Sequence, residues 1–173
     1  AGGLAYASIR NQDRIGLVTF TDRVESFLTP RRTRGHVWAV IQTVFAAEGG
    51  HRGTDLTELF RFVRQVQRRR AVIIVVSDFL DDGPWDTLLG SLARKHKVHA
   101  MLVHDRLDDG LAQLGLLEVV DAETGRSMLV DGRKYRARTT VEERLRRIRR
   151  MGAGAIAIDT EDDPFAKLHG YFQ

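Results

Sequence analysis

Short apolar runs alternate along this chain with longer stretches in which apolar residues recur every three or four positions. The short runs are rich in β-branched residues and lie between turn residues, which predicts buried strands. We predict strands at residues 15–20, 24–28 (ended by Pro30), 71–76, 98–103 and 155–158. The longer stretches have the spacing of helices with one buried face. We predict helices at residues 35–47, from Thr54 or Asp55 to 69, 84–95, from 140 onward and 164–172, and the tail of a helix at 4–10.

This order of elements predicts an α/β fold. Apolar strands separated by helices are typical of a parallel sheet with helices on both faces. We expect strands 15–20, 71–76, 98–103 and 155–158 to share one mainly parallel sheet, with 24–28 antiparallel at its edge. Two further strands, 116–120 and 127–130, flank a turn at 121–125 and predict a small β-hairpin. With 173 residues and no linker or repeat, the chain predicts a single domain over residues 1–173.

Polar side chains follow the predicted parallel strands at the point where each strand ends. The carboxyl ends of such strands meet at one edge of a sheet, where ligands bind. The residues there are Thr19, Thr21, Asp22, Ser77, Asp78, His104, Asp105, Asp159 and Thr160. Their oxygen atoms suit a hard cation such as Mg²⁺. Serine and aspartate also follow strands simply because they cap helices and turn the chain, so both readings stay open.

Composition narrows the choice of function. The chain has no cysteine, which excludes disulfides, thiolate metal sites and cysteine nucleophiles. Its six histidines form no His-x-x-x-His pair, so zinc is not expected. We find no apolar run of membrane-spanning length, no signal peptide, no phosphate-binding glycine loop and no Gly-x-Ser-x-Gly. The net charge is +4, and the arginine rows at 68–70 and 144–150 are interpreted as solvated helix faces rather than a nucleic-acid surface.

Several short sequence motifs, in this order along the chain, resemble those of one known family over nearly the whole chain. They are Asn11 to Asp22, Gly35-His36, Gly53-Thr54-Asp55-Leu56, Val75-Val76-Ser77-Asp78-Phe79-Leu80, Leu92 to Val98, Val103-His104-Asp105 and Val120 to Gly125. The chain resembles a bacterial domain-of-unknown-function family, number fifty-eight, with a von Willebrand factor A-like fold. That resemblance implies a three-layer, Rossmann-like domain with helices on both faces of the sheet.

The resemblance also implies a partial metal-ion-dependent adhesion site. Thr54 matches the threonine that reaches the ion, and Asp78 matches a carboxylate that acts through water. Ser77 and Asp55 are further candidates for contact through water, and Phe79 replaces a glycine that is common at its position. The Asp-x-Ser-x-Ser strand that completes such sites does not occur in the chain. We therefore interpret the chain as an N-terminally truncated fragment, and a natural protein without that strand is the alternative.

These features predict a protein-interaction module rather than an enzyme. In a longer parent, a Mg²⁺ ion at the sheet edge would accept a carboxylate from a partner protein, and the resemblance suggests a MoxR-type AAA+ ATPase as that partner. The chain alone, with one carboxylate and one hydroxyl, is expected to hold Mg²⁺ weakly. The alternative is a metal-dependent phosphoryl-transfer enzyme that uses Asp22, Asp78 and Asp159. We expect a cytoplasmic chain, while the parent could be membrane-anchored.

Overall fold

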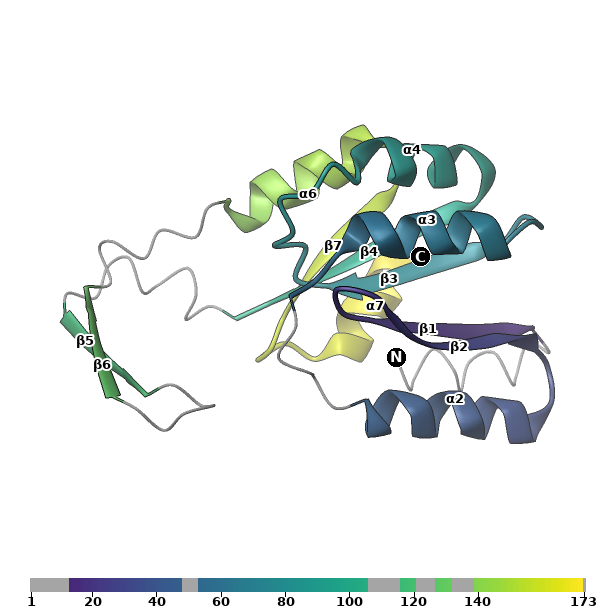
Figure 1. The fold of residues 1–173 in the computed structure, drawn as a ribbon, viewed down its shortest axis with the longest axis horizontal. Helices are drawn as coiled ribbons and strands as arrows, with labels where there is room; N and C mark the ends of the chain where they lie inside the picture. The colour runs from purple at the N-terminus through teal and green to yellow at the C-terminus, as the bar shows by residue number, and fades with distance from the viewer. Residues whose placement is uncertain (1–12, 48–52, 106–115, 121–126, 132–138, 173) are drawn as a thin grey trace.

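A computed structural model describes residues 13–47, 53–105, 116–120, 127–131 and 139–172 of the chain (Figure 1). The predicted helix tail at 4–10 and the predicted hairpin turn at 121–125 lie outside the described residues. The strands are β1 (Ile15–Phe20), β2 (Val24–Arg31), β3 (Val72–Ser77), β4 (Lys97–His104), β5 (Leu116–Val120), β6 (Ser127–Asp131) and β7 (Gly154–Asp159). The helices are α2 (Arg34–Ala46), α3 (Leu56–Val66), α4 (Asp86–Lys95), α6 (Val141–Arg150) and α7 (Pro164–Phe172). The mixed α/β class predicted from the sequence is confirmed.

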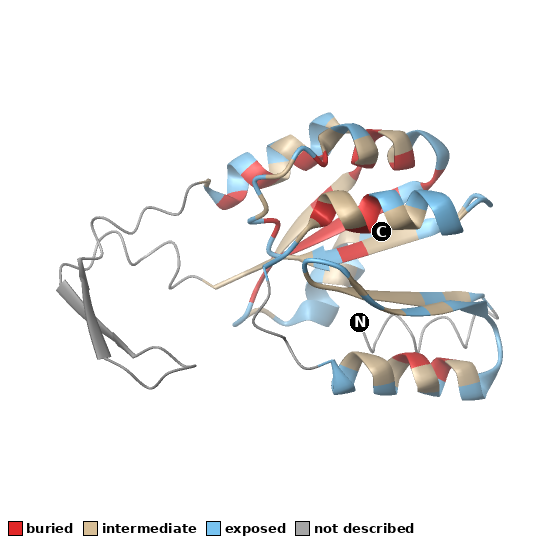
Figure 2. Cartoon of the chain, in the orientation of Figure 1, coloured by how far each residue is buried: buried red, intermediate tan, exposed pale blue. Residues whose placement is uncertain are grey.

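A parallel sheet in the order β3-β4-β7 forms the centre of the molecule. β4 lies in the middle, where Ala100 pairs with Val75 on one side and with Ala155 on the other. These three residues lie on the sheet face that packs into the main hydrophobic core. The core is closed by buried residues of α3, α4 and α6, among them Phe60, Leu89 and Ile148. Figure 2 shows buried positions in red on these helices.

The opposite face of the same sheet is less covered. His99, on that face of β4, contacts Tyr171 and Phe172 of α7 with its ring. Helices therefore lie on both faces of the parallel sheet (Figure 1). At the β3 edge of this face, however, Val72 is 60% exposed and Val76 is 43% exposed. The apolar run of β3 is thus buried on one face and largely open on the other.

The prediction that residues 15–20 belong to the same sheet is wrong. β1 pairs with β2 in a separate two-stranded antiparallel sheet, and within the described residues no ladder joins β1 to β3. An apolar strand pattern indicates burial but does not say which neighbour supplies the hydrogen bonds, and the adjacent β2 is the nearest partner along the chain. The antiparallel direction predicted for residues 24–28 is confirmed.

Three element boundaries differ from the sequence prediction by two residues or more. β2 continues through Pro30 to Arg31, because the pairing is irregular between Ile15 and Leu17, and such a bulge tolerates a residue without an N–H. α3 ends at Val66 rather than near residue 69. α4 starts at Asp86, so Pro84 precedes the helix instead of opening its first turn.

The two remaining parts of the prediction are confirmed. β5 and β6 pair antiparallel, as expected for the small hairpin. The helix predicted from residue 140 onward is α6, and the structure adds that Thr140 caps it: its hydroxyl accepts from Glu143 N, and the Glu143 side chain accepts from Thr140 N. Within the described ranges, no helix is both long enough and apolar enough to cross a bilayer.

Candidate functional site

Three segments meet at the carboxyl end of β3. The backbone N–H of Asp55 donates to Thr21 O across 2.9 Å, which joins the start of α3 to the turn between β1 and β2. The backbone N–H of Leu56 donates to Asp81 Oδ2 across 2.7 Å, which joins it to the loop after β3. That loop, residues 78–85, is called the β3–α4 loop below. The segments that carry the two predicted motifs are therefore bonded together at one end of the sheet (Figure 1).

Asp55 is the N-cap of α3, and this role occupies its carboxylate. Its Oδ1 accepts from Glu58 N at 2.8 Å, which satisfies one of the free N–H groups of the first turn. Thr54 lies one residue earlier, is exposed, and makes no side-chain hydrogen bond with the described residues. Of these two candidates, Thr54 has the hydroxyl that is available to a ligand, and Asp55 serves the helix.

Ser77 and Asp78 shape the start of the β3–α4 loop. Ser77 Oγ accepts from Phe79 N at 3.1 Å, and Asp78 Oδ1 accepts from Leu80 N at 3.1 Å. Ser77 also points its hydroxyl at Asp78 Oδ1 across 3.4 Å. Asp78 is exposed, and its second oxygen, Oδ2, has no hydrogen bond to any described residue. Asp78 therefore presents one carboxylate oxygen to solvent at the sheet edge.

Phe79 adopts a left-handed backbone conformation, with φ of 54°. A residue with a side chain pays roughly 1–2 kcal/mol for this conformation, and glycine pays nothing. The strain is offset because the ring is 2% exposed and packs edge-on against Trp85, with ring centroids 6.0 Å apart. The backbone at position 79 thus adopts a conformation that favours glycine, and here core packing supports it.

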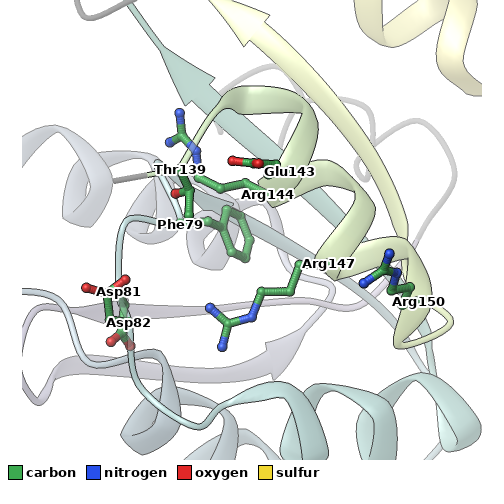
Figure 3. A pocket seen from close by; sticks show the side chains of 8 residues that line it. All are labelled: Phe79, Asp81, Asp82, Thr139, Glu143, Arg144, Arg147 and Arg150. Carbon is green, nitrogen blue, oxygen red and sulfur yellow. The ribbon is translucent and has the colours of Figure 1, made fainter. Parts of the chain in front are cut away.

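Two arginines of α6 fix the β3–α4 loop from the other side. Arg144 is 7% exposed, and its Nη1 donates to Asp78 O. Arg147 donates from Nε and Nη2 to the two carboxylate oxygens of Asp86 at 2.8 and 2.6 Å, and its guanidinium lies 4.0 Å from the Trp85 ring centre. This hydrogen-bonded pairing lowers the pKa of Asp86 and raises that of Arg147. Figure 3 shows both arginines reaching from α6 toward the loop.

The interpretation of all the α6 arginines as a solvated face is wrong for Arg144 and Arg147. Arg144 is on the same face of α6 as Val141 and Ile148, three and four residues away, and all three are buried. This helical spacing is the feature of the sequence that could have predicted the burial of Arg144. Asp81 gave no comparable signal, because its bond to Leu56 N spans two segments that are far apart in the sequence.

The other acidic candidates at this edge, Asp22 and Asp159, each interact with residues of their own segment or of the adjacent strand. Asp22 accepts from Thr21 Oγ1 in the turn after β1. Asp159 is buried at the end of β7, where its Oδ1 accepts from Glu161 N and its Oδ2 lies 3.9 Å from His104 Nδ1. Within the described residues, no three His, Cys, Asp or Glu side chains gather closely enough to hold a metal. The phosphoryl-transfer hypothesis requires Asp22, Asp78 and Asp159 to converge, and the geometry gives it no support.

The candidate site has the type of oxygen ligand that Mg²⁺ prefers but has too few of them. Thr54 and Asp78 offer a hydroxyl and a carboxylate oxygen, which are hard ligands. The nearby Asp55 Oδ1 and Ser77 Oγ already accept backbone hydrogen bonds. Mg²⁺ releases its waters reluctantly, so a site with one free carboxylate does not fit the ion by itself.

Comparison with known proteins agrees with the family resemblance. The family model described as "Protein of unknown function DUF58" matches residues 1–151. An uncharacterised protein of Mycobacterium avium is 34% identical over 135 residues, which cover 74% of this chain and 79% of the relative. An uncharacterised protein of Mycobacterium tuberculosis is 28% identical over 178 aligned positions, covering 97% of this chain and 56% of the relative. The chain thus spans little more than half of this second relative.

The fold has a counterpart among solved structures. The crystal structure of the conserved hypothetical protein BatB from Bacteroides thetaiotaomicron superposes with a TM-score of 0.62, covering 98% of this chain and 83% of that one. The sequence identity is 11%, so this similarity concerns the fold alone. Because the family model covers most of the sequence, the chain belongs to the DUF58 family, whose function is unknown.

Proposed function

We propose that the chain is a von Willebrand A-like protein-interaction module that binds its partner at the carboxyl edge of β3. The observation that carries this proposal is the pair of hydrogen bonds from Asp55 N and Leu56 N, which hold both motif segments at one end of the sheet. Thr54 and Asp78 present free oxygen atoms on those two segments. The proposed role is adhesive and not catalytic.

The three-layer arrangement of such a module would require one more strand. Within the described residues, β1 pairs with β2 alone and β3 pairs with β4 alone, so each has an edge without a ladder. Backbone groups on such edges favour pairing with a further strand. We propose that a strand upstream in the parent protein lies between β1 and β3 and joins the two sheets into one.

The same strand would complete the metal site. An Asp-x-Ser-x-Ser sequence on it would add a carboxylate and two hydroxyls to Thr54 and Asp78, and Mg²⁺ bound there would act as a Lewis acid for a partner's carboxylate. In this chain, Thr54 and Asp78 would orient that group, and Arg144 would hold the Asp78 backbone in place. Family resemblance suggests a MoxR-type AAA+ ATPase as the partner.

The test compares this chain with a parent form that carries the upstream strand. Calorimetric titration is expected to show weak Mg²⁺ binding by the chain and tighter binding by the parent form. Asp78→Ala in the parent form should remove the gain, and Asp13→Ala should not, because Asp13 is exposed at the opposite end of β1. Association with the ATPase, followed by size-exclusion chromatography, should require both Mg²⁺ and Asp78.

Two results would contradict parts of this proposal. Tight, Asp78-dependent Mg²⁺ binding by the short chain would mean that other carboxylates, such as Asp22 or Asp55, complete the site. Association with the ATPase that persists in EDTA and in Asp78→Ala would show that the partner binds elsewhere on the molecule.

A further inference from the structure

Two adjoining hollows run along α6 next to the β3–α4 loop. The outer hollow, of about 260 Å³, is lined by Glu143, Arg146, Arg147 and Arg150. The inner hollow, of about 220 Å³, shares three of these residues and is drawn in Figure 3. It is lined by Phe79, Asp81, Asp82, Thr139, Glu143, Arg144, Arg147 and Arg150. Together they form a surface, called the α6 groove below, that contains both acidic and basic groups.

The acidic groups of the α6 groove are already engaged by the protein. Asp81 accepts from Leu56 N through Oδ2 and from Gly83 N through Oδ1. Glu143 accepts from Thr140 N in the capping box. Asp82, which is also engaged, acts electrostatically on Arg147. These carboxylates hold the groove together and leave little capacity for a cationic ligand.

The basic groups divide into two pairs. Arg144 and Arg147 are held by the Asp78 carbonyl and the Asp86 carboxylate. Arg146 and Arg150 are exposed and form no ion pair with the described residues; Arg146 bonds through Nε to the Glu142 carbonyl of its own helix. Their spacing of four residues places both guanidiniums on one face of α6, where like charges repel and destabilise the helix. An anion between them would remove that repulsion.

We propose that Arg146 and Arg150 bind an acidic segment of a partner protein in the α6 groove. The arginine fork matches a carboxylate with two parallel hydrogen bonds. The fixed Arg144 and Arg147 keep the β3–α4 loop, which forms the far wall, in place. This site is separate from the proposed metal site, because it requires neither a cation nor Thr54.

A nucleic-acid ligand fits the same groove less well. A phosphate backbone would lie against the carboxylates of Asp81, Asp82 and Glu143, which repel it. Base stacking would require exposed aromatic rings; Phe79, which lines the groove, is 2% exposed, and Trp85, which lies against Arg147, is 1% exposed. A short acidic peptide can instead place single carboxylates at the two free arginines and avoid the acidic wall.

The test uses the whole chain and a fluorescent peptide of alternating glutamate and glycine, with EDTA present throughout. Fluorescence anisotropy should show binding that weakens about tenfold or more when Arg146→Gln and Arg150→Gln are combined, since two charge-assisted contacts are lost. Glutamine keeps the helix propensity of arginine, and an unchanged circular dichroism melting curve would verify the fold.

The matched control is the double variant Arg68→Gln and Arg69→Gln, which removes the same amount of charge elsewhere. Both arginines are exposed and follow the end of α3. This variant should bind the peptide as the original chain does. Equal losses in both double variants would overturn the proposal, because binding would then follow net charge alone. Tighter, Arg146- and Arg150-dependent binding of a labelled DNA duplex would also overturn it and assign the groove to nucleic acid.

Discussion

Two halves of this molecule are built from similar apolar sequence and differ in how completely they are buried. The sheet half consists of the parallel sheet with α3, α4 and α6, and the hairpin half consists of the β1–β2 pair with α2. In the first half, Leu56, Leu102 and Ile148 are 0% exposed within one continuous core. In the second half, the described core consists of Val37 and Val40 with partly buried neighbours, while Trp38 and Phe45 are 64% and 83% exposed. Apolar content alone therefore does not set how deeply side chains are buried; closure of the surrounding layers does.

The halves are joined by apolar and backbone contacts, and Val18 and Phe20 of β1 pack against the core of the sheet half. Asp55 N donates to Thr21 O, and Phe27 of β2 packs edge-on against Phe62 of α3 with ring centroids 5.2 Å apart. Phe27 is itself 38% exposed. We expect the hairpin half to open at a lower free energy than the sheet half, because opening it exposes less apolar surface.

The largest expected difference between the halves comes from the same substitution made in each. Leu102→Ala, at a position that is 0% exposed, should lower the free energy of unfolding by about 3–5 kcal/mol, because the closed core cannot collapse around the lost atoms. Leu28→Ala, at a partly buried position, should cost about 1–2 kcal/mol. Urea unfolding measures both values. Equal losses would show that the hairpin half is packed as tightly as the sheet half.

A glycine substitution tests the less covered face of the parallel sheet. A Cβ at Gly154 would lie 2.1 Å from Tyr171 Oη and 2.8 Å from His99 Nδ1, so Gly154→Ala should displace α7 and cost about 1–3 kcal/mol. Gly90→Ala is the control, because its nearest atoms lie at 3.7 Å and a helix interior favours alanine by about 0.5–1 kcal/mol. Thermal unfolding of both variants is the measurement. An unaffected Gly154→Ala protein would show that α7 contributes little to the fold.

The pH dependence of stability should be dominated by two buried histidines of the sheet half. Burial is the main cause that lowers the pKa of His96 and of His99, assisted by the positive charges of Lys95 and Arg70 near the first and Lys97 near the second. The unfolded chain then binds protons at a higher pH than the folded chain does. Stability is therefore retained above pH ~6.5 and should fall below it by up to about 1.4 kcal/mol per pH unit for each histidine.

His99→Phe tests this assignment. It removes the titrating ring that bonds to Tyr171 Oη across 2.8 Å, so the slope of stability against pH should decrease. Denaturant titrations between pH 5 and pH 8 provide the measurement, and an unchanged slope in His99→Phe would assign the acid sensitivity to other groups.

The smallest expected effect separates the two candidate site residues at the junction of the halves. Asp55→Ala should cost about 1 kcal/mol, because Glu58 N loses its capping partner at the start of α3. Thr54→Ala should leave stability unchanged, since its hydroxyl bonds to no described residue. A comparable loss in Thr54→Ala would assign that hydroxyl a structural role and weaken its candidacy as a ligand.

Local patterns in the sequence predicted the elements well, and relations between elements less well. β1 and α7 have the predicted bounds, and α6 begins next to Thr140 as predicted, because strand composition, a leading proline and helical spacing act over a few positions. The separation of β1 from β3 depends on which edges pair, which apolar pattern does not encode.

The candidate site divides in the same way. The sequence placed Asp78 after a strand and Thr54 before a helix, both of which the structure has. The hydrogen bond between Asp81 and Leu56 N joins residues 25 positions apart, and the bond between Arg144 and the Asp78 carbonyl joins residues 66 positions apart. Charged residues are expected at the surface on average, so only the helical spacing of Arg144 with Val141 and Ile148 could have indicated its burial.

The pairing of the strands has a further consequence, for the order of folding. β1 and β2 are joined by a short turn, so their ladder can form within microseconds. β4 and β7 pair Ala100 with Ala155, which are far apart in the sequence. Bringing these strands together is slow, because the chain between them loses conformational entropy before any contact is gained. We therefore expect the β1–β2 hairpin to form early in refolding and to become stable only after the parallel sheet has formed. The structure that forms first is then also the first to be lost on unfolding.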